Sequence, residues 1–261
     1  MMVIDKELEH LKKNLAESFS DPCAENDILD FVLGPSKRIR SVLAILYLKA
    51  LGCEINNNTF KILVAGELIH NASLFHDDVI DNAEKRRNET VFAKKYSPKV
   101  SILAGDFLLT IAIKNLLSLN NEHIFLLFQN CTQKMVEAEL KQYFLRGNFT
   151  SYEEYAQISC NKTSLLFATI LEASAIQNNL DVDQAKRIGI LFGDAFQLKN
   201  DTIPDSRNLD MNNGICTVVD ILGIENSKNL LDNYKKELLL IMDKIPKNIY
   251  RLELEGLINS L

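Results

Sequence analysis

The chain has 261 residues, of which 47% are hydrophobic and 25% charged, and its formal net charge is -6. A chain of this length and apolar content buries a large core, and nothing in its composition requires more than one domain. The acidic balance excludes a general basic surface, so we expect no nucleic-acid partner and a local cluster of cations for any anionic ligand.

The cysteines and the apolar segments limit the cellular setting. The 5 cysteines are widely spaced and form no CxxC pair, which argues against a disulfide framework and against a zinc site. The N-terminal sequence MMVIDKELEHLKK lacks the apolar run of a signal peptide, and we identify no segment of membrane-spanning length. The sequence therefore predicts a soluble, cytoplasmic protein without stable membrane insertion.

Long segments with apolar residues at three- and four-residue spacing predict an all-α fold. No hairpin turn is flanked by alternating apolar residues, so no sheet is expected. In chain order, the expected helices span residues 3–19, 37–52, 58–82, 98–118, 121–146, 151–178 and 182–203, and two or three shorter helices follow. The polar segment SRNLDMNNG (206–214) is predicted to be a mobile loop, because it is rich in turn-forming residues.

The segment GPSKRIR (34–40) follows a turn and begins a helix. The unpaired N–H groups and the dipole of a helix start favour an anion. Lys37, Arg38 and Arg40 add positive charge at this place, which makes the segment a candidate cradle for a diphosphate. The alternative is a set of solvated cations at a helix start.

A run of carboxylates, HDDVID (76–81), ends the helix expected over 58–82. Asp77 and Asp81 lie within about 40° of each other on such a helix, and Asp78 is adjacent. Like charges this close repel each other unless a cation lies between them, and a site of oxygen ligands suits Mg²⁺. His70, seven residues before Asp77, lies on the same stripe. The alternative is a solvated acidic helix end, which the apolar residues earlier in the helix make less favourable.

Two more sets of cations are candidates for binding phosphate. Arg86 and Arg87 follow the acidic run, and guanidinium groups match phosphate oxygens two at a time. Lys162, followed by Thr163, lies in an otherwise apolar helix, where a lysine is costly to bury unless an anion meets it. The alternatives are solvated arginines and a lysine that extends to solvent.

Six segments in this order resemble the signature blocks of the trans-isoprenyl diphosphate synthases, also called polyprenyl synthetases. They are GPSKRIR, ELIHNASLFHDDVIDNAEKRR, ILAGDFLL, EAELKQ, YEEYAQISCNKTSLLF and FGDAFQLKND, and the resemblance covers about residues 31 to 217. It implies one polyprenyl synthetase-like domain over residues 1–261. The implied fold is an all-α bundle around a deep central cavity, a homodimer in most members, with acidic motifs facing each other across the cavity mouth.

The resemblance also implies roles for single residues. Residues that match the family's isopentenyl diphosphate site are Lys37, Arg40, His70 and Arg87, beside the neighbouring Arg38. Asp77, Asp78 and Asp81 match the first aspartate-rich motif, which binds Mg²⁺. Arg86 and Lys162 match side chains on the allylic diphosphate, and Thr163 and Gln197 match residues that line the reacting centre.

The implied activity is that of a trans-prenyltransferase, which joins isopentenyl diphosphate to dimethylallyl, geranyl or farnesyl diphosphate. The allylic diphosphate ionises, the isopentenyl double bond attacks, and a proton is lost to a diphosphate oxygen. In this family the residues four and five positions before the first aspartate, here Ser73 and Ala72, influence product length. Because both are small, the resemblance predicts products longer than C20. The alternatives are that their size only lets two helices approach, or that a deeper apolar floor sets the length.

The second acidic motif departs from the family pattern FQxxDDxxD. Asn200 stands at the first metal-binding aspartate and Pro204 at the third, with Asp201 retained between them. The amide removes a negative charge, and the proline cannot donate an N–H to the Asn200 carbonyl, so the helix should bend or stop there. Asp205 is a candidate substitute ligand. Ile215 stands at a lysine of the family, and the chain is expected to lack part of the C-terminal helical cap.

These departures leave three functions open. The first is an active prenyltransferase. The second is a weakly active or inactive subunit that supports a complete synthase. The third, less favoured, is a class I terpene cyclase, in which the isopentenyl-binding residues would have no use.

Overall fold

A computed structural model describes residues 3–19, 22–86, 89–148 and 150–261; at positions 22–25, 205, 206, 208 and 209 it describes the main chain alone. The described chain is helical apart from one short antiparallel ladder, in which β1 (Lys85–Arg86) pairs with β2 (Glu89–Thr90). This confirms the predicted all-α class. The chain divides into two compact units, one of residues 1–42 and 55–125, the other of residues 43–54 and 126–261.

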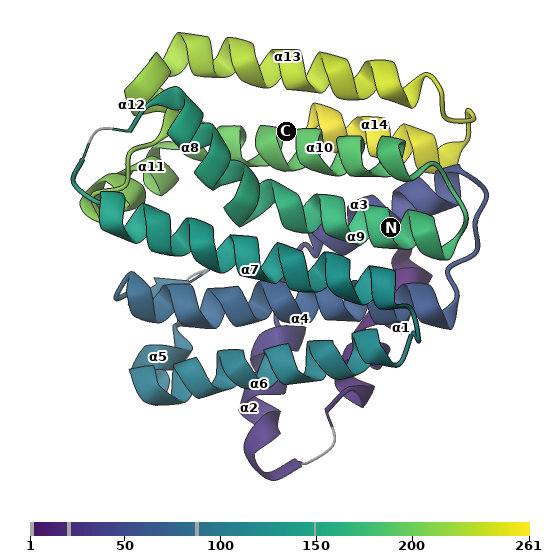
Figure 1. The fold of residues 1–261 in the computed structure, drawn as a ribbon, viewed down its shortest axis with the longest axis horizontal. Helices are drawn as coiled ribbons and strands as arrows, with labels where there is room; N and C mark the ends of the chain where they lie inside the picture. Colours follow the sequence, from purple (N-terminus) through teal and green to yellow (C-terminus); the bar gives the residue numbers. More distant parts are fainter. Residues whose placement is uncertain (1–2, 20–21, 87–88, 149) are drawn as a thin grey trace. The chain divides into compact units, whose positions relative to one another are not determined.

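The first unit is built around α4 (Asn57–Ile80), which is buried on almost all sides over its middle turns. Asn56 begins this helix by accepting a hydrogen bond from the Thr59 N–H, and Ser97 begins α6 in the same way. The other helices of this unit are α1 (Asp5–Glu17), α2 (Pro22–Leu33), α5 (Phe92–Lys95) and α6 (Pro98–Leu117). Helix α6 lies along α4 (Figure 1).

A glycine allows close contact between α4 and α6. A Cβ atom at Gly105 would come within 3.0 Å of the His76 ring, so the ring occupies the space that any other residue would fill. The Ser101 hydroxyl donates to the Phe75 carbonyl at 2.9 Å, which bonds the same two helices. The end of α4 that carries the acidic run is therefore held closely against α6.

The second unit is built around α10 (Val182–Thr202), which lies between α9 (Leu165–Gln177) and α13 (Ile224–Met242) (Figure 1). Helix α3 (Ile39–Ala50) and helix α7 (Glu122–Leu145) each begin in the first unit and continue in the second. The remaining elements are α8 (Tyr152–Ser159), the π-helical segment η1 (Cys160–Ser164), α11 (Pro204–Asn212), α12 (Val218–Leu222) and α14 (Ile249–Asn259).

Two glycines let α10 approach η1 and α9 closely. A Cβ atom at Gly189 would lie within 3.0 Å of the Ala168 main chain, and one at Gly193 within 3.0 Å of the Ser164 Cα. The two glycines are four residues apart, as are Ser164 and Ala168, so both contacts lie on one face of each helix. This approach sets the distance across which the polar residues of the second unit meet.

The structure confirms most of the expected helices and corrects several points. Helices α2 and α5 and the short β1–β2 ladder were not predicted. The helix expected over 151–178 contains a π-helical turn, and segment 206–214 is not a loop, because most of it belongs to α11. The C-terminal helices are not all short, since α13 has 19 residues. The expected break at Pro204 is confirmed: α10 ends at Thr202, Ile203 is extended, and α11 begins at the proline.

Helix α6 also differs from expectation in its composition. Among the described residues it is the one helix long and apolar enough to cross a membrane. No such segment was expected from the sequence. The core helices of soluble proteins can meet the same criterion, and 39% of the apolar window is buried within the protein, so composition alone does not indicate a membrane span.

Candidate active site

The first acidic motif lies at the C-terminal end of α4. The Asp81 N–H donates to the Asp77 carbonyl at 2.8 Å, so Asp81 keeps the helical register although α4 ends one residue earlier. Both side chains are partly exposed. The structure therefore places Asp77 and Asp81 on one face, as the sequence predicts.

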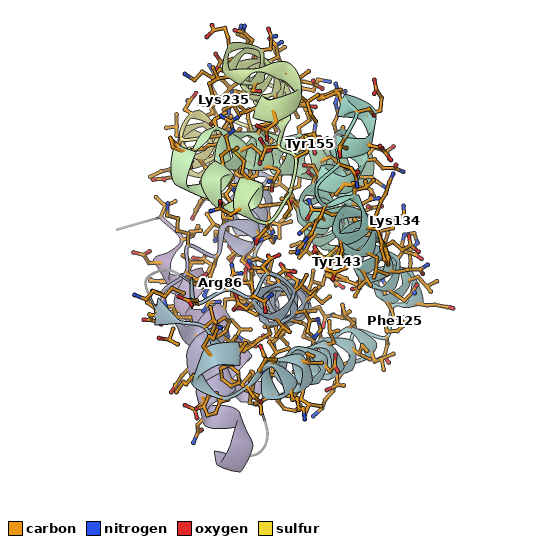
Figure 2. All side chains as sticks on the ribbon, turned by 90° about the vertical axis from the view of Figure 1, so that its left-hand side faces the viewer. Arg86, Phe125, Lys134, Tyr143, Tyr155 and Lys235 are labelled. Carbon is orange, nitrogen blue, oxygen red and sulfur yellow. The ribbon has the colours of Figure 1, made fainter. Side chains whose placement is uncertain are left out.

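Asp78 has a different environment from its two neighbours. It is only 1% exposed, and the Arg86 Nε and Nη2 atoms both lie 2.9 Å from its Oδ1. Burial raises the pKa of Asp78, and the charge of Arg86 opposes that shift. Arg86, labelled in Figure 2, thereby ties the β1 strand to the end of α4. These contacts hold the pair together, and the expected metal contact of Asp78 and diphosphate contact of Arg86 stay predictions.

The predicted basic cradle separates into exposed and buried residues. Lys37 is exposed, whereas Arg38 is 5% exposed and has a φ of 44°, which is unusual for a residue other than glycine. The Arg38 guanidinium donates to the Val32 carbonyl at 2.9 Å and pairs with the buried Glu67 at 3.4 Å. Arg38 therefore holds the turn against α4, and its contact with a diphosphate stays a prediction.

The remaining expected residues of the first unit lie in three different settings. Arg40 is buried and His70 is partly exposed. Ala72 is 1% exposed, and the partly exposed Ser73 donates its hydroxyl to the His70 carbonyl at 2.9 Å. Arg87 lies outside the described residues.

Lys162 and Thr163 lie in the π-helical segment η1 of the second unit. The Lys162 ammonium donates to the Gln142 carbonyl oxygen at 2.8 Å and forms an ion pair with Glu139, both on α7. A lysine that is only 29% exposed thus meets an acidic partner within the protein. The sequence analysis assigned no role to Glu139 or Gln142. Two features could have identified them: their place in the block EAELKQ, and the need of Lys162 for an acidic partner.

A chain of hydrogen bonds joins Thr163 to the second acidic motif. The Thr163 hydroxyl donates to Gln197 Oε1 at 3.0 Å, and Gln197 Nε2 donates to Asp201 Oδ1 at 2.7 Å. Asp201 Oδ2 accepts from the Tyr155 hydroxyl at 2.7 Å and from the Val218 N–H at 3.1 Å. The structure thus brings together Thr163, Gln197 and Asp201, and it adds Tyr155, which the sequence did not single out.

Burial shifts the pKa values of several residues joined by these hydrogen bonds. It raises the pKa of Asp201, and the donors Tyr155, Val218 and Gln197 oppose that shift. Burial and the neighbouring Asp201 carboxylate raise the pKa of Tyr155 well above its ordinary value, so the phenol keeps its proton. Burial also raises the pKa of Asp194, which lies one helical turn before Leu198. The Asp194 carboxylate accepts a hydrogen bond from the Ser164 hydroxyl.

The two acidic motifs differ in how well they fit Mg²⁺. No three His, Cys, Asp or Glu side chains of the described residues form a ready metal site. Mg²⁺ in phosphate-binding proteins commonly uses one or two carboxylates together with substrate phosphates, and Asp77 with Asp81 fits that pattern. The second motif fits poorly: Asn200 offers a neutral amide, Asp201 is buried among donors, and the Asp205 side chain is not among those that the structure describes.

A family model described as polyprenyl synthetase matches residues 24–239, from α2 to within α13. The chain belongs to the polyprenyl synthetase family. Octaprenyl diphosphate synthase of Haemophilus influenzae is 30% identical to this polyprenyl synthetase over 210 residues, which cover 78% of this chain and 64% of that protein. The chain spans 64%, 48% and 54% of the lengths of the first three curated relatives that it matches.

Solved structures agree with the polyprenyl synthetase fold. Heptaprenyl diphosphate synthase from Staphylococcus aureus superposes with a TM-score of 0.92 at 23% identity, covering 99% of this chain and 98% of that one. Geranyltranstransferase from Thermotoga maritima superposes with a TM-score of 0.84 at 27% identity, covering 98% and 96% of the two chains.

Proposed function

We propose that this polyprenyl synthetase is a trans-prenyltransferase that joins isopentenyl diphosphate to an allylic diphosphate and releases a longer trans-polyprenyl diphosphate. The observation that carries the proposal is the register of Asp77 and Asp81 at the end of α4, in a chain matched to the family over residues 24–239. Dimethylallyl, geranyl and farnesyl diphosphates are the candidate allylic substrates.

The proposed site uses Asp77 and Asp81 to hold Mg²⁺, which supplies positive charge against the diphosphate of the allylic substrate. Lys162, which contacts Glu139 and Gln142, is a proposed ligand of an allylic diphosphate. Lys37, Arg40, His70 and Arg87 are the proposed ligands of isopentenyl diphosphate. Thr163 and Gln197, whose orientations are fixed by hydrogen bonds, would border the reacting carbon atoms.

The chemistry then needs stabilised charge and little proton transfer from the protein. As the allylic C–O bond breaks, cationic side chains offset the negative charge that develops on the leaving diphosphate. The isopentenyl double bond attacks the allylic cation, forming the new C–C bond. The proton lost from the adduct passes to an oxygen of the released diphosphate.

The second candidate is a subunit with little activity of its own that supports a complete synthase. The buried Asp201, the neutral Asn200 and the helix break before Pro204 favour it, because together they weaken the second motif as a metal site. The complete Asp77 and Asp81 pair favours the enzyme.

We also propose that the protein is a cytoplasmic homodimer. Within the first unit, α6 exposes Leu103 and Leu117 by 66% and 58%; within the second, α7 exposes Phe144 by 77%. Large apolar side chains exposed along helices are typical of surfaces that a partner covers. Sedimentation analysis tests this proposal, and a monomer at micromolar concentration would contradict it.

One assay separates the functions. The purified protein is incubated alone with Mg²⁺, isopentenyl diphosphate and farnesyl diphosphate. An elongated diphosphate supports the synthase, absence of product without a second protein supports the subunit, and a free hydrocarbon supports a cyclase.

A further inference from the structure

The residues around Asp201 form a connected set of hydrogen bonds, which we call the Asp201 network. It consists of Thr163, Gln197, Asp201, Tyr155 and the main-chain N–H of Val218. The network joins η1, α10, α8 and the first turn of α12, and all of its residues belong to the second unit. Tyr155 is labelled in Figure 2.

The Asp201 carboxylate determines which group donates and which accepts in each hydrogen bond of the network. An ionised Asp201 can only accept hydrogen bonds, so Gln197 must turn its NH₂ group toward it. The carbonyl oxygen of Gln197 then faces Thr163, whose hydroxyl proton must point toward that oxygen. The orientation of two residues proposed to border the reacting carbons therefore follows from the position of one carboxylate.

The environment of Asp201 is unsuited to binding a metal. The residue is 2% exposed, and each of its oxygens accepts at least one hydrogen bond. Coordination of Mg²⁺ by Asp201 would remove hydrogen bonds from Tyr155, Gln197 or Val218 and leave buried donors without an acceptor. Asp77 and Asp81 are instead partly exposed at a helix end, where water can replace a contact that a bound metal displaces.

We propose that Asp201 is a positioning residue, anchored by Tyr155, that orients Gln197 and Thr163, and that it is not a ligand for Mg²⁺. The inference rests on the proposed prenyltransferase function. The metal-binding part of the second motif is then reduced to Asn200 and any contribution from Asp205. The close contact of Gly193 with Ser164 supports this assignment, because it fixes the distance between η1 and α10 that the network crosses.

A matched pair of variants, Asp201→Asn and Asp77→Asn, tests the assignment. Each replaces a carboxylate with an amide of the same shape. Binding of Mn²⁺ in the presence of inorganic diphosphate is followed by electron paramagnetic resonance of the free ion. We expect Asp77→Asn to weaken Mn²⁺ binding at least tenfold and Asp201→Asn to change it less than twofold. Equal weakening by both variants would overturn the proposal.

Steady-state kinetics and NMR give two further readouts. At saturating Mg²⁺, Asp201→Asn should lower kcat at least tenfold with KM for isopentenyl diphosphate unchanged, and Tyr155→Phe should lower kcat in the same way but less. The side-chain amide protons of Gln197 should exchange with solvent at least tenfold faster in both variants than in the wild type. Exchange at the wild-type rate in both would overturn the proposal.

Failure of this inference can be told apart from failure of the proposed function. Absence of product from the wild-type protein contradicts the function, whereas Mn²⁺ binding and amide exchange need no turnover and still decide the role of Asp201. If Asp201→Asn does not fold, Tyr155→Phe, which removes a single hydroxyl, decides it by the amide exchange of Gln197.

Discussion

Substitution of Gly193 by alanine tests how the close approach of α10 and η1 supports the site. The added Cβ would lie within 3.0 Å of the Ser164 Cα, a main-chain atom that cannot rotate away. We expect the two helical segments to separate, and overpacking of this kind costs about 1–3 kcal/mol. The separation would lengthen the 3.0 Å hydrogen bond between Thr163 and Gln197, so activity should fall together with stability.

The chain offers a matched control in Gly256, which lies within α14 of the same unit and where an added Cβ would meet no atom within 4 Å. Alanine gains about 1 kcal/mol over glycine in a helix interior, and this gain is common to both sites. The difference between Gly193→Ala and Gly256→Ala therefore isolates the cost of the close contact. A difference of about 2 kcal/mol corresponds to roughly 4–8 °C in Tm for a chain of this size.

Thermal and urea unfolding, followed by circular dichroism, measure this difference, and product formation measures activity. We expect Gly256→Ala to be at least as stable as the wild type and equally active. Equal stability and activity of Gly193→Ala and Gly256→Ala would refute the reasoning, because the backbones would then have room to adjust.

Substitutions at five other positions test the site. Asp77→Ala or Asp81→Ala should abolish turnover with an almost unchanged Tm, since both side chains are partly exposed. A variant that keeps more than about a tenth of the wild-type rate loses less than about 1.4 kcal/mol of transition-state stabilisation. That result would remove the residue from the metal site. Asn200→Asp should lower the Mg²⁺ concentration that gives half-maximal rate, because it adds a charged oxygen; an unchanged or higher requirement would show that residue 200 does not face the metal. Ser73→Tyr should shorten the products separated by reversed-phase chromatography, and an unaltered distribution at normal rate would exclude this residue from the tunnel wall. Ala72→Phe should also shorten them, at a cost in stability because Ala72 is 1% exposed.

Periodicity predicted the long helices because an apolar stripe must face a core wherever it lies in the fold. Periodicity failed where the local amino-acid composition indicated a different secondary structure from the one observed. Segment 206–214 is rich in turn-forming residues, yet α11 begins at Pro204, and Arg207 ties it to Asp220 at 2.5 Å. Helix α2 also begins with a proline, a start signal that apolar periodicity alone does not include.

The site was predictable in its residue types but not in its division of roles. Asp77, Asp78 and Asp201 are chemically identical in the sequence, and only the structure distinguishes them. Asp78 is enclosed with Arg86, eight residues later, while Asp201 meets Tyr155, which is 46 residues away along the chain. The π-helical turn at 160–164 was equally inaccessible, because it inserts into an otherwise regular apolar pattern.

The contact between His76 and Gly105 links the end of α4 that carries the proposed metal ligands to the position of α6. Helix α6 cannot slide along α4 without displacing the ring next to Asp77. If two copies of the chain associate through α6, a shift of this helix at their interface would also move the His76 ring, one residue before Asp77. Affinity for the metal and affinity for the second copy would then vary together, and a substitution selected for one would alter the other.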